Sequence, residues 1–198
     1  MARTLITIAL GLLASVAAAQ DPAAVQRMFE AGQFRQAADA AVPSAPPAVT
    51  FVGGLSHQKL GEAAQAAAAY QRLAERQGDP AWQAIGTSAI QLLQGQIDAA
   101  EQSAQAAVAA GPSIPEAYYQ LGLVLAQRQA WNEASAAFDR TTELNPSFAY
   151  AHYYGGLMHY RANRPDRMAV HFEQFLKLAP TAPERPEVQQ IMRTIRGR

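Results

Sequence analysis

Cysteine is absent from this 198-residue chain, and its absence excludes several kinds of function at once. Without a thiolate there is no cysteine nucleophile and no cysteine ligand for a structural metal ion. Disulfide bonds are excluded as well, so packing alone must stabilise the fold. The sequence also lacks HExxH and GxSxG motifs and a glycine-rich phosphate loop between a strand and a helix. We therefore predict no catalytic residues, no cofactor and no metal ion, and so a protein that is not an enzyme.

An excess of charge is lacking too. The chain contains 16 basic and 16 acidic residues, which balance to a formal net charge of +0 at pH 7. Proteins that bind nucleic acids usually carry an excess of lysine and arginine. The composition therefore predicts no nucleic-acid partner.

A long apolar run occurs at residues 5–16, but it is shorter than the roughly 20 apolar residues that span a bilayer. Arg3 precedes this run and small residues ending at Ala19 follow it, which is the layout of a secretory signal peptide. We predict a signal peptide at residues 1–19 that is cleaved after Ala19. The mature chain is then periplasmic or secreted, without an integral membrane span, in a Gram-negative bacterium. An uncleaved membrane anchor is the alternative.

Strand-like alternation of β-branched residues is also missing, and alanine, glutamine and leucine dominate, which predicts an all-α fold. Three features recur every 34 residues: a small residue, an aromatic residue four places later and a helix breaker twelve places later. They occupy, respectively, Ala66, Ala100, Ala134 and Met168; Tyr70, Ala104, Phe138 and Phe172; and Gly78, Pro112, Pro146 and Pro180. A small residue lets two helices approach closely, the ring fills the space beside it, and proline ends the second helix. The pattern predicts stacked helical hairpins.

With these recurring residues the sequence resembles the tetratricopeptide-repeat family across roughly residues 47–181. The resemblance implies a right-handed α-solenoid of helical hairpins with a C-terminal capping helix. The predicted units are an N-terminal helical hairpin at 20–45, repeats at 47–80, 81–114, 115–148 and 149–182, and the capping helix at 183–198. The second repeat is degenerate, because it lacks the aromatic residues of the family pattern.

The resemblance also implies where a partner binds. In this family the first helix of each repeat lines a concave groove that holds an extended peptide or a partner helix. The corresponding positions here are Phe51, Leu55, Trp82, Ile85, Tyr119, Leu123, Tyr150, Tyr153, Leu157, Tyr160 and Arg161. A groove rich in tyrosine and tryptophan suits an apolar peptide or an amphipathic helix. The alternative is that the N-terminal hairpin or the terminal helix covers these positions.

Three of the four histidines, His152, His159 and His171, fall in the last predicted repeat. His152 and His159 are seven residues apart, so they share one helix face, and no acidic residue has that spacing. We interpret these histidines as flat packing rings rather than as metal ligands.

These observations predict a non-enzymatic scaffold or adaptor in the cell envelope that binds an apolar or helical segment of another protein. A structural subunit that forms a homo-oligomer is the second hypothesis. A small-molecule or metal sensor that uses the histidine-containing last repeat is the third.

Overall fold

Eleven helices and no strand make up residues 21–196, the part of the chain that this computed structural model describes. The predicted signal peptide, 1–19, lies outside these residues. The helices are α2 (Pro22–Glu30), α3 (Phe34–Asp39), α4 (Pro47–Lys59), α5 (Ala63–Ala74), α6 (Pro80–Leu93), α7 (Ile97–Ala110), α8 (Pro115–Gln127), α9 (Trp131–Leu144), α10 (Ala149–Arg161), α11 (Pro165–Leu178) and α12 (Arg185–Arg196). The predicted all-α solenoid is confirmed. Within residues 21–196, no helix has the length and apolar character that crossing a membrane requires.

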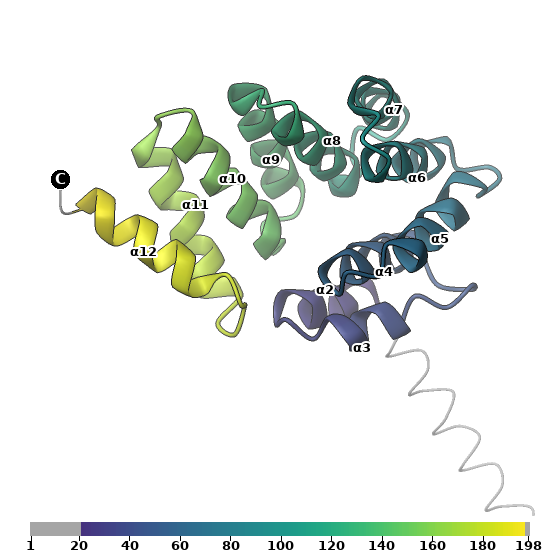
Figure 1. The fold of residues 1–198 in the computed structure, drawn as a ribbon, viewed down its shortest axis with the longest axis horizontal. Coiled ribbons are helices and arrows are strands. Elements are labelled where there is room, and N and C mark those ends of the chain that lie inside the picture. Colours follow the sequence, from purple (N-terminus) through teal and green to yellow (C-terminus); the bar gives the residue numbers. More distant parts are fainter. Residues whose placement is uncertain (1–20, 197–198) are drawn as a thin grey trace, which may run out of the picture.

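Consecutive helices pack against each other as antiparallel hairpins that follow one another along a curved stack (Figure 1). Each predicted repeat contains one such pair, from α4 with α5 to α10 with α11. Proline stands at the start of several helices, where its missing N–H has no helical acceptor to lose. Asp79 caps α6 by accepting a hydrogen bond from the backbone N–H of Trp82.

The turn inside each repeat uses one left-handed residue at a fixed place. Gly61, Gly95, Gln129 and Asn163 have φ angles of 75°, 73°, 64° and 57°. These positions are 34 residues apart, so the period seen in the sequence extends to the backbone conformation. Glycine adopts this conformation without steric penalty, and the last two repeats use residues with a side chain instead.

The recurring small residues and rings meet as the sequence pattern predicts. Ala134 is fully buried, and the Phe138 ring lies over Gly122 of the preceding helix. A Cβ atom added at Gly122 would lie 2.8 Å from that ring. In the last repeat, a Cβ added at Gly156 would lie 2.4 Å from the ring of Phe172. The two helices of a repeat are therefore close because glycine faces an aromatic ring.

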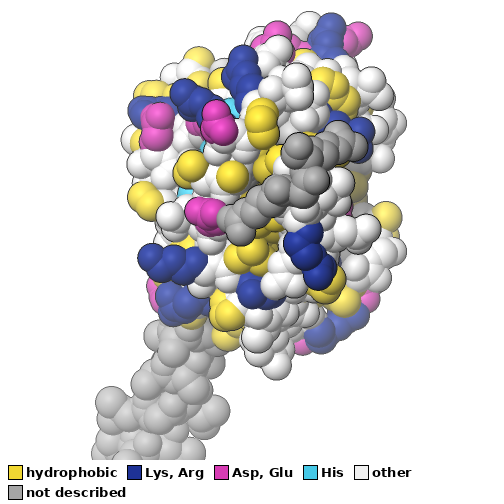
Figure 2. Space-filling view, turned by 90° about the vertical axis from the view of Figure 1, so that its left-hand side faces the viewer, with side chains coloured by type: hydrophobic (Ala, Val, Ile, Leu, Met, Phe, Trp, Pro, Cys, Tyr) yellow, Lys and Arg dark blue, Asp and Glu magenta, His cyan; other side chains and the backbone are white. Residues whose placement is uncertain are grey.

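The helix α12 covers the end of the stack, as predicted for a cap. Val188 and Met192 are buried against the core, whereas the outward positions of α12 are polar and exposed: Glu187, Gln189, Gln190, Arg193 and Thr194. Figure 2 views this end of the molecule, where hydrophobic side chains are interspersed with basic and acidic ones. A polar outer face closes a solenoid without leaving a sticky surface.

The stack bends so strongly that its N-terminal hairpin touches the last repeat (Figure 1). Phe29 of α2 packs on Tyr150 of α10, with ring centroids 4.7 Å apart. The Glu30 carboxylate accepts a hydrogen bond of 2.7 Å from the backbone N–H of Ala149. The hydroxyl of Thr181 lies 3.5 Å from the carbonyl oxygen of Ala31. These contacts close the curve, and one continuous apolar core runs from α2 to α12.

Candidate interaction site on the concave surface

Most of the residues predicted to line the groove lie in the interior. Seven of them are buried: Phe51, Leu55, Trp82, Ile85, Tyr119, Tyr150 and Tyr153. Leu123 and Leu157 are partly exposed, and Tyr160 and Arg161 are exposed. An open trough lined by all eleven side chains is therefore not present in this structure. Partner binding at these positions stays a prediction, because burial in the free chain does not test it.

The curvature of the solenoid brings groove residues from separate repeats into contact. The rings of Phe51 on α4 and Tyr119 on α8 meet edge to face, with centroids 6.2 Å apart. Tyr119 also stacks on Phe148, at 4.7 Å and an interplanar angle of 18°. The N-terminal hairpin covers Tyr150 through Phe29, which is the coverage considered above as the alternative. These rings contribute to the core of the closed molecule instead of forming an open ladder.

A cavity of about 580 Å³ remains on the concave side between α4, α6 and α8. Three predicted groove residues line it, namely Leu55, Tyr119 and Leu123. The remaining lining residues are Phe29, Gln58, Lys59, Tyr70, Ala89, Leu92, Leu93, Gln120, Ala126, Gln127 and Tyr154. Of these, Gln58, Lys59 and Gln127 are exposed, and they place the rim of the cavity at the surface. The size lies within the range of about 300–1,000 Å³ that is usual for ligand sites.

The cavity has an apolar floor and polar groups that are mostly uncharged. The Tyr70 hydroxyl donates a hydrogen bond of 2.9 Å to the Gln58 side chain. Burial raises the pKa values of Tyr70 and Tyr119 well above the ordinary value, so both phenols stay protonated at neutral pH. Lys59 is the one charged residue among the lining, and its ammonium group lies 2.7 Å from the Glu184 carboxylate and 5.1 Å from the centre of the Tyr150 ring. Such a cavity can hold an apolar side chain or a short helical turn by packing.

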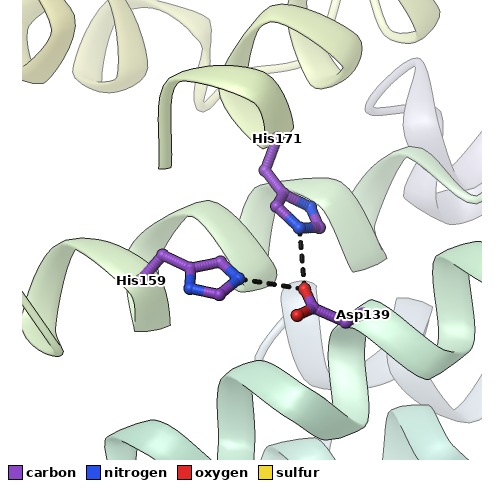
Figure 3. Close-up of side chains that lie close together, drawn as sticks. All are labelled: Asp139, His159 and His171. Atoms are coloured by element: carbon purple, nitrogen blue, oxygen red, sulfur yellow. Dashed lines mark hydrogen bonds and ion pairs between the residues drawn. The ribbon is translucent and has the colours of Figure 1, made fainter. Parts of the chain in front are cut away.

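A second group of functional side chains lies away from this cavity, in the last two repeats (Figure 3). Asp139 on α9 is placed between His159 on α10 and His171 on α11. Both imidazole Nε2 atoms lie within hydrogen-bonding distance of the same carboxylate oxygen, Asp139 Oδ1, at 2.9 Å for His159 and 2.8 Å for His171. Burial tends to raise the pKa of Asp139, but the two imidazole hydrogen bonds outweigh it and hold this pKa well below its usual range.

The sequence analysis missed this acidic partner because it searched along one helix. His152 and His159 share a face, but the carboxylate comes from the preceding repeat, 20 residues before His159. His152 makes a separate contact, since its Nε2 atom lies 3.1 Å from the carbonyl oxygen of Pro146. Burial lowers the pKa of His152, so this ring stays neutral more readily than an exposed histidine. The available signal was that Asp139 directly follows Phe138, whose ring contacts both neighbouring helices.

Residues 91–134 and 130–183 match the sequence profile described as tetratricopeptide repeat. The chain is a tetratricopeptide-repeat protein. Among solved structures, the tetratricopeptide-repeat protein TTC0263 of Thermus thermophilus superposes with a TM-score of 0.61 and 15% sequence identity. That match covers 89% of this chain and 97% of TTC0263. The structure of MamA has a TM-score of 0.50 and 20% identity, over 76% of this chain and 91% of MamA.

At these identities the similarity to solved tetratricopeptide-repeat proteins establishes the fold alone. No curated protein matches the sequence significantly. The family assignment supports a role in protein interaction, because helical-repeat frameworks of this kind use their concave surface for binding. It does not select the partner, since the fold carries many different functions.

Proposed function

We propose that this tetratricopeptide-repeat protein is a non-enzymatic scaffold that binds an apolar segment of another protein in its concave cavity. The observation that carries the proposal is the cavity itself, which is bounded by the first helices of three successive repeats. Its floor is aromatic and aliphatic, and Lys59 is the only charged residue in its lining. This lining disfavours a carboxylate or phosphate group as the main anchor and favours a packed apolar side chain.

The cavity suggests the size of the bound element. Its volume of about 580 Å³ accommodates a few side chains, not a whole helix. Gln58 and Gln127 stand at the rim, where their amide groups can bond to the backbone of a bound peptide. A short peptide segment with one or two large apolar residues therefore fits better than the long amphipathic helix that an open groove would hold.

We expect Leu123→Asp to reduce partner capture by about tenfold or more, because it places a charge on the apolar wall of the cavity. Val170→Asp is the matched control, since Val170 is a 61% exposed aliphatic residue on α11 and does not line the cavity. Both variants and the unaltered protein are used as bait against an envelope extract of the source organism, and bound proteins are quantified by mass spectrometry. Equal recovery with both variants would place the binding surface elsewhere.

The layout of residues 1–19 supports a location outside the cytoplasm, and the envelope of a Gram-negative bacterium is part of the proposal. We expect protein recovered from the periplasmic fraction to begin at Gln20. Intact-mass measurement of the purified protein tests this directly. Replacing Ala19 with a bulky residue such as arginine should block cleavage and leave the protein in the membrane fraction, whereas full-length protein in the cytoplasm would contradict the proposed location.

A further inference from the structure

Three side chains with metal-binding atoms converge from three consecutive helices, away from the concave cavity (Figure 3). They are Asp139 of α9, His159 of α10 and His171 of α11, and one ligand atom from each lies within 4.8 Å of the others. We propose that these three residues bind a divalent transition-metal ion, with Zn²⁺ as the ion that suits them best. The proposal is independent of the scaffold function, because no member of the group lines the cavity.

The set of donor atoms supports this assignment. Two imidazole nitrogens and one carboxylate oxygen make up a common protein ligand set for Zn²⁺ that leaves one coordination position open. Bonds of about 2.0–2.2 Å in tetrahedral geometry place ligand atoms roughly 3.4 Å apart. The Nε2 atoms of His159 and His171 are now 2.9 and 2.8 Å from Asp139 Oδ1. A modest outward movement of the side chains therefore creates the required space.

Packing alone does not account for two histidines at this place. His159 is fully buried and His171 is 8% exposed, yet both rings direct a nitrogen to one shared oxygen. The Nδ1 atoms of both rings are buried and have no hydrogen-bond partner among the described residues. Buried polar atoms without a partner are uncommon, and apolar rings would fill the same space without this penalty. A ligand role explains why imidazoles occupy both positions.

An ion can reach the group from the side of the carboxylate. The Asp139 side chain is 23% exposed, whereas those of His171 and His159 are 11% and 1% exposed. Patches of histidine surface are visible on the face shown in Figure 2. Arg167, whose side chain is 68% exposed, lies 3.5 Å from the other carboxylate oxygen and is free to swing into solvent. The bound ion would join α9 to both helices of the last repeat, and so fix the angle between the third and fourth repeats.

The test is a calorimetric titration of untagged, chelator-treated full-length protein with zinc chloride. We expect one Zn²⁺ per chain and a higher melting temperature of the zinc-loaded protein. Asp139→Asn keeps an oxygen acceptor for the two imidazoles but loses the charge, and it should weaken Zn²⁺ binding by at least about tenfold. His57→Ala is the control for histidine content, because His57 lies on α4 and pairs with Glu62. This variant should bind Zn²⁺ like the unaltered protein.

A second measurement uses Co²⁺, whose intense ligand-field absorption reports tetrahedral coordination. The spectrum should appear with the unaltered protein and with His57→Ala, and it should be lost in His171→Gln, which removes the imidazole while keeping a side chain of similar length. Circular dichroism confirms that each variant is folded. The proposal is overturned if the unaltered protein takes up no Zn²⁺, if Asp139→Asn binds Zn²⁺ as tightly, or if His57→Ala loses the same affinity.

Discussion

Replacing Phe138 with alanine is expected to lower the free energy of unfolding by about 3–5 kcal/mol. The Phe138 ring is fully buried at the centre of the third repeat. It stacks on Tyr154 of the next repeat at 5.6 Å and meets Tyr119 edge to face at the same distance. Because Gly122 lies beneath the ring and has no side chain, nothing nearby can refill the space that the substitution leaves. Urea denaturation followed by circular dichroism measures the loss.

Tyr118→Ala is the matched control for this prediction. Tyr118 lies on the same repeat but is partly exposed, and its main contact is the Arg140 guanidinium, 5.8 Å from the ring centre. Its truncation should cost about 1 kcal/mol. If the two substitutions cost the same free energy, Phe138 does not act as the central ring of the repeat.

A double-mutant cycle sharpens the same prediction. In the unaltered protein Gly122→Ala should destabilise the fold, because the added Cβ would lie 2.8 Å from the Phe138 ring. After Phe138→Ala this obstacle is gone, and Gly122→Ala should instead stabilise the helix by about 1 kcal/mol. The cycle should therefore yield a coupling energy of about 1–3 kcal/mol. Additive effects would show that the glycine and the ring do not face each other.

The hairpins of this fold could be predicted from the sequence because their main contacts are local. Ala134, Phe138 and Pro146 act within one repeat and on its neighbours, so the spacing of 34 residues encodes these contacts directly. The same local logic located the left-handed turn glycines, Gly61 and Gly95, although not the Gln129 and Asn163 that replace them later. Nearest-neighbour packing is the part of a solenoid that sequence periodicity records.

The closure of the stack could not be predicted in this way. The contact between Phe51 and Tyr119, and that between Phe29 and Tyr150, depend on the curvature accumulated over several repeats. No spacing along the chain specifies that sum, and the N-terminal hairpin lies outside the regular register. The groove residues were therefore named by their positions in the repeat, while their burial came from the overall bend. The group around Asp139 was missed for a related reason, since its members come from three different helices.

The contact between the N-terminal hairpin and the last repeat should make stability depend on pH. Glu30 is only 5% exposed, and burial, the largest influence on it, raises the pKa of its carboxyl group to about 7. Hydrogen bonds from the Gln26 side chain and the Ala149 backbone N–H, together with the charge of Arg27, act in the opposite direction but do not cancel the effect of burial. In the unfolded chain the same group has its ordinary pKa of 4.5.

Between pH 4.5 and about 7 the folded protein therefore keeps a proton on Glu30 that the unfolded chain has released. The free energy of unfolding should fall as the pH rises through this window, by up to about 3 kcal/mol in total, and the contribution is fully present below pH 4.5. Glu30→Gln keeps the hydrogen-bond acceptor and removes the titration, so this fall should disappear. Glu133→Gln, at an exposed position on α9, is the control. Urea denaturation of all three proteins at several pH values isolates the effect of Glu30, because other titrating groups contribute equally to each curve. Parallel curves for the unaltered protein and Glu30→Gln would mean that the carboxyl group is hydrated, and that the hairpin does not close against α10 in solution.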